Sequence, residues 1–493
     1  MTSNSTPGPK TNQDPTLKEK TAKGLFWGGI GNGFQQIVQL IFGIIMLHLL
    51  NSEDYGIVGM LAIFSAIALI IQDSGFSTAL VNKKEIRYED YNAVFWFSVL
   101  SSIISYTFLF YMAPFIASFF ERPILIPIAR ILFLSFLINS FGVAQHAFLV
   151  KKLMVKERAK IDIFALTISG IIGIILAYNG YKYWAIIIQN ISYMTIGVLA
   201  RWYYCPWKPT LHINFSPLKK MVSFSINIFF TVIFSKVVEN IFSILLGKYY
   251  DEKQVGYYTQ GNKWSTMGGS FVTGMINSVA LPVLTELRSE KERQKNAFRK
   301  MLRFGALISF PLMLGLAFIG KEFLLIAGGG DKWVPATPYL QLFCIWNSAF
   351  YIWSLYTNVI MTHHKSNIFM WGTILTGTLQ LIIVIATFKF GILQMVFAYI
   401  CIYFAGLLFW HYFTNKLIGL RLWHVIKDIA PYLITAIGSI TICWFITKNI
   451  DNIYLKFILK IIITSVLYLL IIWKSNSVIV RECYEFIKHK FTT

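Results

Sequence analysis

The chain has 493 residues, of which 56% are hydrophobic and only 14% are charged, and its mean hydropathy is +0.59. So many apolar side chains could not be covered by so little polar surface, which excludes a soluble globular protein. Apolar runs of about 20 residues, the length that crosses a bilayer as a helix, recur along the chain and predict an all-α polytopic membrane protein.

The apolar runs begin after a polar N-terminal segment. Residues 1–23 are rich in Pro, Ser, Thr and Lys and predict a disordered cytoplasmic tail rather than a cleavable signal peptide. We expect about 14 transmembrane helices. Their approximate limits are 25–50, 56–81, 92–113, 123–149, 161–178, 183–203, 221–246, 264–284, 302–327, 338–361, 367–388, 391–414, 429–447 and 453–473.

The connecting segments predict two six-helix lobes around a central cavity, with two additional C-terminal helices. A segment with three prolines separates helix 6 from helix 7 and indicates a linker. A faint repeat supports this division: "MLHLLNSEDYGIVGM" and "ILLGKYYDEKQVGYYT" both have an acidic turn and then a Gly step, at Gly56 and Gly256. The predicted units are 24–203 (N-terminal lobe), 204–220 (cytoplasmic linker), 221–414 (C-terminal lobe), 425–473 (helices 13 and 14) and 474–493 (cytoplasmic tail).

Most of the 44 Lys and Arg side chains fall in alternate connecting segments, such as "KKEIR" (83–87) and "KKLMVKERAK" (151–160). This asymmetry follows the positive-inside rule with both termini cytoplasmic. The net charge of +21 is therefore mainly a topology signal, and no nucleic-acid partner is expected. The five cysteines have no metal-type spacing, so neither disulfides nor a metal site nor a cofactor is predicted.

Two of the predicted helices carry ordered polar stripes. Polar groups at bilayer depth are costly and usually face a bundle interior or a wet cavity. Because these stripes recur every three or four residues and open the two halves, we expect them to face each other across a cleft. They consist of Gly24, Gly28, Gly31, Gln35 and Gln39 in the first run, and Ser225, Phe229, Lys236, Asn240 and Ser243, with Glu239 at the edge, in the seventh.

Lys236 and Glu239 are one helical turn apart and could pair directly. Two readings stay open: a neutralised pair that only packs, or a cavity cation for an anionic substrate with Glu239 as partner or proton acceptor. Arg130 could snorkel to the outer surface or face the cavity. Asp73 could cap its helix or pair with an inner-loop Lys, and it is the second candidate, after Glu239, for ion coupling.

Signals for an enzyme are poor. The adjacent histidines of "THHKSN" (362–367) cannot share one helix face for a metal. "AGGGDKW" (327–333) lacks the preceding strand and the Gly-Lys-Ser/Thr ending of a phosphate loop. We therefore expect a protein that is not an enzyme.

Four segments resemble a known family. They are "GLFWGGIGNGFQQIVQLIFGIIMLHLLNSEDYGIVGM" (24–60), "EDYNAVFWFSVL" (89–100), "VGYYTQGNKW" (255–264) and "KWVPATPYLQLF" (332–343). They look like Wzx-type polysaccharide flippases of the multidrug/oligosaccharidyl-lipid/polysaccharide exporter superfamily, in the lipopolysaccharide, colanic-acid and teichuronic-acid branch.

The resemblance implies a flippase of the bacterial inner membrane that moves an undecaprenyl-pyrophosphate-linked oligosaccharide by alternating access. A coupling ion (H⁺ or Na⁺), contact with membrane lipid and a polysaccharide polymerase partner are further expectations. Lys236, and Arg130 if it faces the cavity, would attract the pyrophosphate, and Gln35, Gln39 and Asn240 would bind sugar hydroxyls. Where relatives often have an Asp-type residue in the seventh helix, this chain has Glu239.

Two alternatives remain. A cation-coupled multidrug exporter of the same superfamily would need carboxylates facing the cavity, whereas the first run has glutamines. A polytopic glycosyltransferase or polymerase would need a sizeable outer loop with catalytic His, Arg or Asp, and the predicted outer loops are short.

Overall fold

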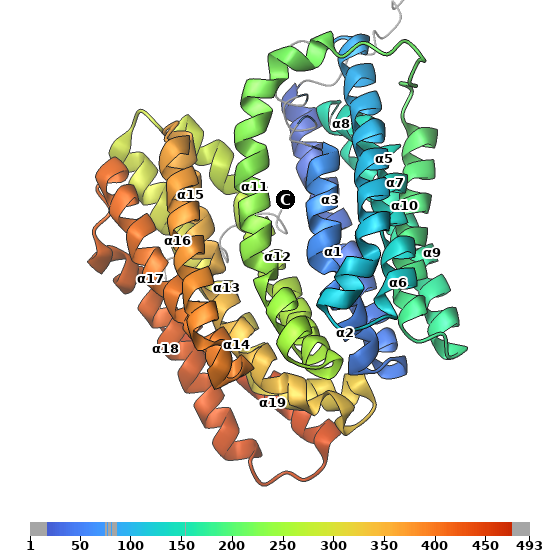
Figure 1. The fold of residues 1–493 in the computed structure, drawn as a ribbon. Helices are drawn as coiled ribbons and strands as arrows, with labels where there is room; N and C mark the ends of the chain where they lie inside the picture. The colour runs from blue at the N-terminus through green and yellow to red at the C-terminus, as the bar shows by residue number, and fades with distance from the viewer. Residues whose placement is uncertain (1–16, 74–75, 77–79, 81–85, 153, 476–493) are drawn as a thin grey trace, which may run out of the picture.

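The computed structural model describes residues 17–73, 76, 80, 86–152 and 154–475, with 17–32, 73 and 219–231 as backbone only. Within these residues the chain forms helices and no strand, which confirms the all-α prediction (Figure 1). Nine described helices are long and apolar enough to cross a membrane, or up to eleven if each of two bent pairs is one span. The predicted count of 14 is therefore not confirmed.

The first half of the chain forms the N-terminal group of helices. Its first helix begins at Leu17, inside the segment predicted as a tail. The group comprises α1 (Leu17–Leu49), α2 (Ser52–Met60), α3 (Ala62–Asp73), α5 (Tyr88–Phe119), α6 (Leu125–Leu132), α7 (Leu134–Ser140), α8 (Val143–Lys151), α9 (Val155–Tyr178) and α10 (Tyr183–Tyr204).

The second half forms the C-terminal group. It comprises α11 (Ser216–Tyr249), α12 (Glu252–Glu286), α13 (Lys291–Gly328), η1 (Asp331–Ala336), α14 (Thr337–Ser348), α15 (Phe350–Thr362), α16 (Ser366–Thr387), η2 (Phe388–Phe390), α17 (Ile392–Ile418), α18 (Leu422–Thr447) and α19 (Ile453–Lys474).

Several predicted runs are interrupted helices. The run 123–149 is divided into α6, α7 and α8, and the run 338–361 into α14 and α15. Near these breaks serine hydroxyls donate to carbonyls three residues earlier, at 2.6 Å from Ser140 to Leu137 and 2.7 Å from Ser348 to Ile345. Such bonds satisfy the backbone acceptors that a break releases, which lets a helix bend at membrane depth.

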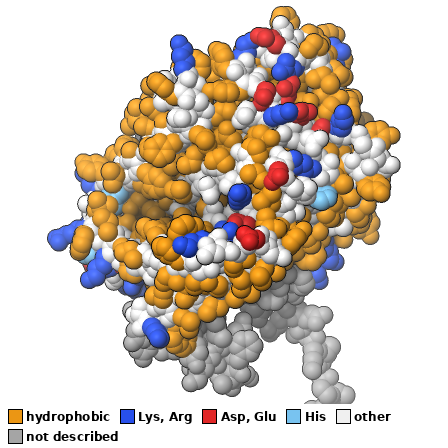
Figure 2. All heavy atoms as spheres, turned by 90° about the horizontal axis from the view of Figure 1, so that it is seen from below, with side chains coloured by type: hydrophobic (Ala, Val, Ile, Leu, Met, Phe, Trp, Pro, Cys, Tyr) orange, Lys and Arg blue, Asp and Glu red, His pale blue; other side chains and the backbone are white. Residues whose placement is uncertain are grey.

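The two groups meet mainly at one end of the molecule. Contacts between them run through α2 with α12, α3 with α11, and α1 with α13. We call this the α2 end, at the bottom of Figure 1, and we call the opposite end, with residues 205–215, the linker end. Figure 2 views the α2 end and shows acidic and basic side chains close together among hydrophobic ones. The predicted lobe boundaries stay an interpretation.

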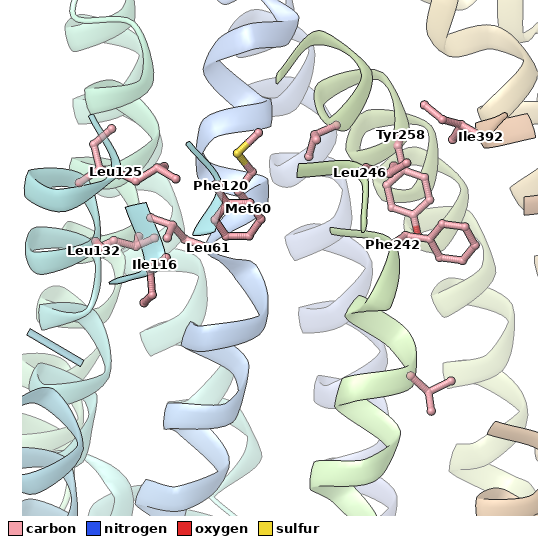
Figure 3. Close-up of a cluster of buried hydrophobic side chains, with 14 of the residues drawn as sticks. Met60, Leu61, Ile116, Phe120, Leu125, Leu132, Phe242, Leu246, Tyr258 and Ile392 are labelled. Atoms are coloured by element: carbon pink, nitrogen blue, oxygen red, sulfur yellow. The ribbon is translucent and has the colours of Figure 1, made fainter. Parts of the chain in front are cut away.

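A hydrophobic core joins the groups near the α2 end. Its buried members include Met60 of α2, Phe120 after α5, Phe242 of α11 and Tyr258 of α12 (Figure 3). Phe242 stacks on Tyr258 with ring centroids 5.1 Å apart. Because this core contains side chains from both halves, closing the α2 end buries apolar surface that opening it would expose.

Ion pairs to Asp428 and Glu322 fasten the C-terminal hairpin α18–α19 to α13. Arg299 of α13 donates two hydrogen bonds to the buried Asp428 of α18, at 2.6 and 3.0 Å. Nearer the α2 end, Lys460 of α19 lies 2.7 Å from Glu322 of α13, and both side chains are less than 10% exposed. The second oxygen of Glu322 has no hydrogen-bond partner among the described residues, so this carboxylate depends on Lys460.

Replacing Lys460 by Met is expected to lower the free energy of unfolding by about 3–5 kcal/mol, because the Glu322 carboxylate would stay buried without its partner. Thermal unfolding of the purified protein in detergent measures the loss. The control is Arg293→Gln, which breaks an exposed pair with Glu290 (2.7 Å) and should lower the stability far less. Glu322→Leu combined with Lys460→Met should recover most of the loss; equal losses in Lys460→Met and Arg293→Gln would contradict the account.

Candidate functional site

A cavity of about 640 Å³ lies between the two helix groups. The N-terminal group contributes side chains from α1, α2, α9 and α10, and the C-terminal group contributes α11 and α12. Both groups thus form its wall, and the contact between α2 and α12 lies at one end of it. Any relative movement of the two groups would change the shape of this space.

The cavity wall carries many polar side chains. Besides Glu239 and Lys263 and two tyrosines, they are amides and hydroxyls: Gln36, Gln39, Gln189, Asn240, Asn262, Ser243, Thr259, Thr266 and Ser270. Amides and hydroxyls both donate and accept hydrogen bonds, so they complement a ligand with many hydroxyl groups. Groups of this kind at membrane depth indicate a wet path.

The α1 wall contains part of the predicted stripe. Gln39 lines the cavity, whereas Gln35 is not among the lining side chains and its neighbour Gln36 is. Gln36, Gln39, Gly43 and Met46 follow one another at helical spacing along the cavity face. Of the other predicted members, the side-chain environments of Gly24, Gly28 and Gly31 lie outside the described residues.

On α11 the predicted charges are paired. Lys236 forms an ion pair with Glu239, and the Asn240 amide donates to the Lys236 carbonyl at 2.9 Å. Glu239, Asn240 and Ser243 line the cavity. Lys236 is not a lining residue; it lies one turn nearer the linker end, with its side chain 40% exposed. The side chains of Ser225 and Phe229 lie outside the described residues.

A cavity cation that the sequence reasoning missed is Lys263 of α12. Its ammonium nitrogen lies 5.8 Å from the ring centre of Tyr55 and 5.3 Å from that of Trp264, within the range of cation–π attraction. Within the part of the chain that the structure describes, no carboxylate forms an ion pair with it. Lys263 therefore offers its charge to the cavity.

Lys263 was missed because the eighth apolar run was expected to start at residue 264. The structure starts α12 at Glu252, after Asp251, whose carboxylate accepts a hydrogen bond from the Gln254 backbone N–H at 2.9 Å. Asp at the N-cap is a recognised start signal for a helix. With that start, Thr259, Lys263, Thr266 and Ser270 fall on one helical face, which is a signal that the sequence contained.

Two other predicted residues lie elsewhere. The Arg130 guanidinium lies 4.2 Å from the ring centre of Phe110 and donates to the Phe110 carbonyl at 3.4 Å, so it holds α6 against α5 and does not line the cavity. Asp73 ends α3, and its side chain lies outside the described residues.

Glu239 also borders a second, smaller space of about 140 Å³ inside the C-terminal group. Oxygen-bearing side chains from α11, α16 and α17 line it, and they include Ser235, Thr376, Gln380 and Tyr399. Glu239 thus stands between the central cavity and a largely aromatic pocket that several oxygen-bearing side chains also line. Oxygen atoms are the ligands that hard cations prefer. Among the described residues no group of three or more His, Cys, Asp or Glu could hold a metal ion.

Solved structures of two membrane transport proteins superpose on this fold. The lipid II flippase MurJ in an inward closed conformation superposes with a TM-score of 0.75 at 14% sequence identity, covering 90% of this chain and 97% of MurJ. An inward-facing multidrug resistance transporter of the MATE family gives a TM-score of 0.61 at 15% identity, covering 78% of this chain and 95% of the other. At such low identity these matches show a shared fold.

Sequence comparison identifies the family. Teichuronic acid biosynthesis protein TuaB of Bacillus subtilis is 24% identical over 436 residues, which cover 86% of this chain and 88% of TuaB. Lipopolysaccharide biosynthesis protein WzxC of Escherichia coli is 20% identical over 332 residues, 67% of each chain. The family model described as "Polysaccharide biosynthesis protein" matches residues 45–338, more than half of the chain. The chain therefore belongs to this family of polysaccharide biosynthesis proteins, which confirms the predicted resemblance to Wzx-type flippases.

Proposed function

We propose that the protein is a flippase that moves an undecaprenyl-pyrophosphate-linked oligosaccharide from the inner to the outer leaflet of the bacterial cytoplasmic membrane. The observation that carries this proposal is the polar cavity between the two helix groups, with Lys263 in its wall. The relatives named for teichuronic acid and lipopolysaccharide biosynthesis support the substrate class. The linker end would then be cytoplasmic, as the positive-inside rule predicts.

The chemistry of the cavity suits this substrate. A pyrophosphate diester is anionic, and Lys263 can attract it without first giving up a carboxylate partner among the described residues. The amide and hydroxyl side chains can exchange hydrogen bonds with sugar hydroxyls. A volume of about 640 Å³ is within the usual range of ligand pockets, about 300–1,000 Å³. Chemical conversion of the substrate is not needed, only movement.

Lys236 has a related role in this proposal. It lies one turn closer to the linker end than the cavity-lining Asn240, where an entering pyrophosphate would pass before it reaches Lys263. The ion pair with Glu239 neutralises the positive charge of Lys236 until the substrate arrives. We assign Arg130 to helix packing instead, since its guanidinium rests on Phe110.

A cation-coupled multidrug exporter is the second candidate, favoured by the MATE-like fold. Such an exporter needs negative charge facing a cationic drug. Among the described residues the charged side chains that line this cavity are Glu239 and Lys263, and Glu239 is paired with Lys236. The net electrostatics of the wall therefore favour an anionic substrate.

Transport of a charged lipid against a gradient needs an energy source, and we propose Glu239 as the group that binds a coupling ion, H⁺ or Na⁺. It borders both the cavity and the small pocket whose lining includes Ser235, Thr376 and Gln380. An ion bound there would compete with Lys236 for the carboxylate and so alter the positive charge offered to the substrate. Asp73 stays the second candidate for binding the coupling ion, predicted from the sequence alone.

Lys263→Gln is expected to slow translocation of undecaprenyl-pyrophosphate oligosaccharide by about tenfold to a hundredfold, the value of one charge-assisted hydrogen bond. Fluorescent substrate in proteoliposomes measures the rate. Lys263→Arg should retain most of it. The matched control is Lys416→Gln, which removes a Lys from the face of Tyr412 outside the cavity and should have little effect. Equal rates in wild type and Lys263→Gln would contradict the assignment; transport of cationic dyes instead would favour the exporter.

Glu239→Gln should make transport insensitive to an imposed Na⁺ or H⁺ gradient. The reason is that a neutral amide, unlike a carboxylate, cannot bind and release a proton or attract Na⁺ by its charge. The measurement compares initial rates with and without each gradient. Glu286→Gln, which changes a carboxylate at the C-terminal end of α12 outside the cavity lining, should keep the gradient response. A gradient response that survives in Glu239→Gln would exclude this residue as the coupling site.

A further inference from the structure

The two helix groups cross each other at backbone contact, at a pair of glycines that are 200 positions apart. A Cβ atom added to Gly56 of α2 would lie 1.9 Å from the Glu252 carbonyl oxygen, and one added to Gly256 of α12 would lie 1.9 Å from the Ser52 carbonyl oxygen. The two contacts are reciprocal: each glycine lies against the first turn of the helix that carries the other glycine. No other residue type fits at either position unless the helices move apart.

Matching start signals create this crossing. Asn51 is the N-cap of α2, with its backbone N–H donating to Asp54 at 3.0 Å, and Asp251 is the N-cap of α12. Each helix then reaches its glycine in the second turn. The faint sequence repeat around Gly56 and Gly256 therefore corresponds to one contact, in which each copy of the repeat packs against the other.

Ion pairs surround the crossing and join the groups. Glu53 pairs with Lys253 at 3.4 Å, Lys248 pairs with Glu121 at 2.7 Å, and Arg122 donates to Glu252 at 3.2 Å. The Lys248 ammonium, which hydrogen-bonds the Glu121 carboxylate, lowers the pKa of Glu121. Each pair has at least one exposed partner, so the pairs can break and re-form in water at modest cost.

The segment "AGGGDKW" (327–333) adds further contacts between the two helix groups, next to the crossing. Gly329 and Gly330 turn the chain with φ of +69° and +129° after α13. Lys332 then donates to the carbonyls of His48 (2.5 Å) and Leu50 (3.0 Å), and the Trp333 indole N–H donates to Leu47 (2.8 Å). These donors from the C-terminal group satisfy carbonyls at the C-terminus of α1 that have no partner within the helix.

Tyr55 connects this closed end with the cavity. It lies between Gly56 and the cavity, whose wall it joins, and its ring packs edge-on against Trp333 with centroids 5.6 Å apart. The Lys263 ammonium lies over the same ring. A phosphate that draws Lys263 away would therefore change a contact of the ring that touches Trp333.

We propose that the crossing of α2 and α12 is the outer gate of the transporter and that Tyr55 couples binding at Lys263 to its opening. This inference rests on the proposed function for the direction of transport. A ligand can open a gate only if it binds the open state better than the closed one. The ion pairs and the glycine contact involve no covalent bond, and each ion pair has at least one exposed partner, so the closed state can open.

The test locks the gate with a disulfide in a chain whose five native cysteines are replaced. A Cβ at position 59 would lie 3.9 Å from the Thr259 Cβ, close to the spacing of about 3.8 Å in disulfides. The variant carries Gly59→Cys, Thr259→Cys and, as reporter in the cavity wall, Ser270→Cys. Readouts in right-side-out vesicles are labelling of the reporter by a membrane-impermeant maleimide from outside, and translocation of undecaprenyl-pyrophosphate oligosaccharide.

Oxidation is expected to stop both outside labelling and translocation, and reduction should restore both to the rates before oxidation. The variants with only one of the two gate cysteines, each compared with itself, should not respond to oxidant. Outside labelling that continues after complete disulfide formation would overturn the gate, whatever the cargo. If labelling stops as expected but the unlocked protein never moves the lipid, the gate stands and the proposed function fails.

The role of Tyr55 is tested by how fast the two gate cysteines form their disulfide. Undecaprenyl pyrophosphate is expected to slow this reaction severalfold, because occupancy separates α2 from α12. Tyr55→Ala should abolish the slowing. The matched control is Tyr257→Ala, which also removes a ring packed edge-on against Trp333 (6.1 Å) but not a ring of the cavity wall, and should keep it. Slowing that persists in Tyr55→Ala, or that is lost in both variants, would overturn the coupling.

Discussion

A polar side chain in a bilayer must be paired or must face water, and this constraint organises the molecule. Lys460 and Glu322 satisfy it by pairing, and Arg130 by resting on an aromatic ring and a carbonyl. The amides and hydroxyls of α1, α10, α11 and α12 satisfy it by facing one shared cavity. Buried ion pairs therefore hold helices together, while the polar side chains that share the cavity line the path that we propose for the substrate.

The same distinction separates fixed from movable contacts. The links of α13 to α18 and α19 are buried ion pairs, which are costly to break, so the C-terminal hairpin moves with its group. The links between the groups at the α2 end are a shared hydrophobic core, ion pairs that each have an exposed partner, a glycine crossing and capping hydrogen bonds. An interface of this kind is suited to opening, and it encloses one end of the cavity.

The sequence predicted the all-α class and the family. Of the residues proposed for the substrate cavity, Gln39, Glu239 and Asn240 lie in the wall of the central cavity, and their roles stay predictions. The sequence reasoning missed Lys263, because hydropathy placed the start of the eighth run after it, whereas the N-cap Asp251 starts the helix earlier. The donors Lys332 and Trp333 were also unpredictable, since their acceptors lie more than 280 residues away in the sequence. Long-range pairing of this kind leaves no local pattern. By itself the segment "AGGGDKW" suggests only a phosphate loop, and it lacks the sequence features of one.

The most direct test of the account is whether the cavity face of α12 binds the anionic lipid. In a chain without native cysteines, Thr266→Cys lines the cavity, and its neighbour Ser265→Cys is fully buried and serves as the control. We expect a water-soluble thiol reagent to label the cysteine at 266 and not the one at 265, and undecaprenyl pyrophosphate to slow the labelling. No labelling at 266, or labelling that the lipid leaves unchanged, would contradict a substrate path through this cavity.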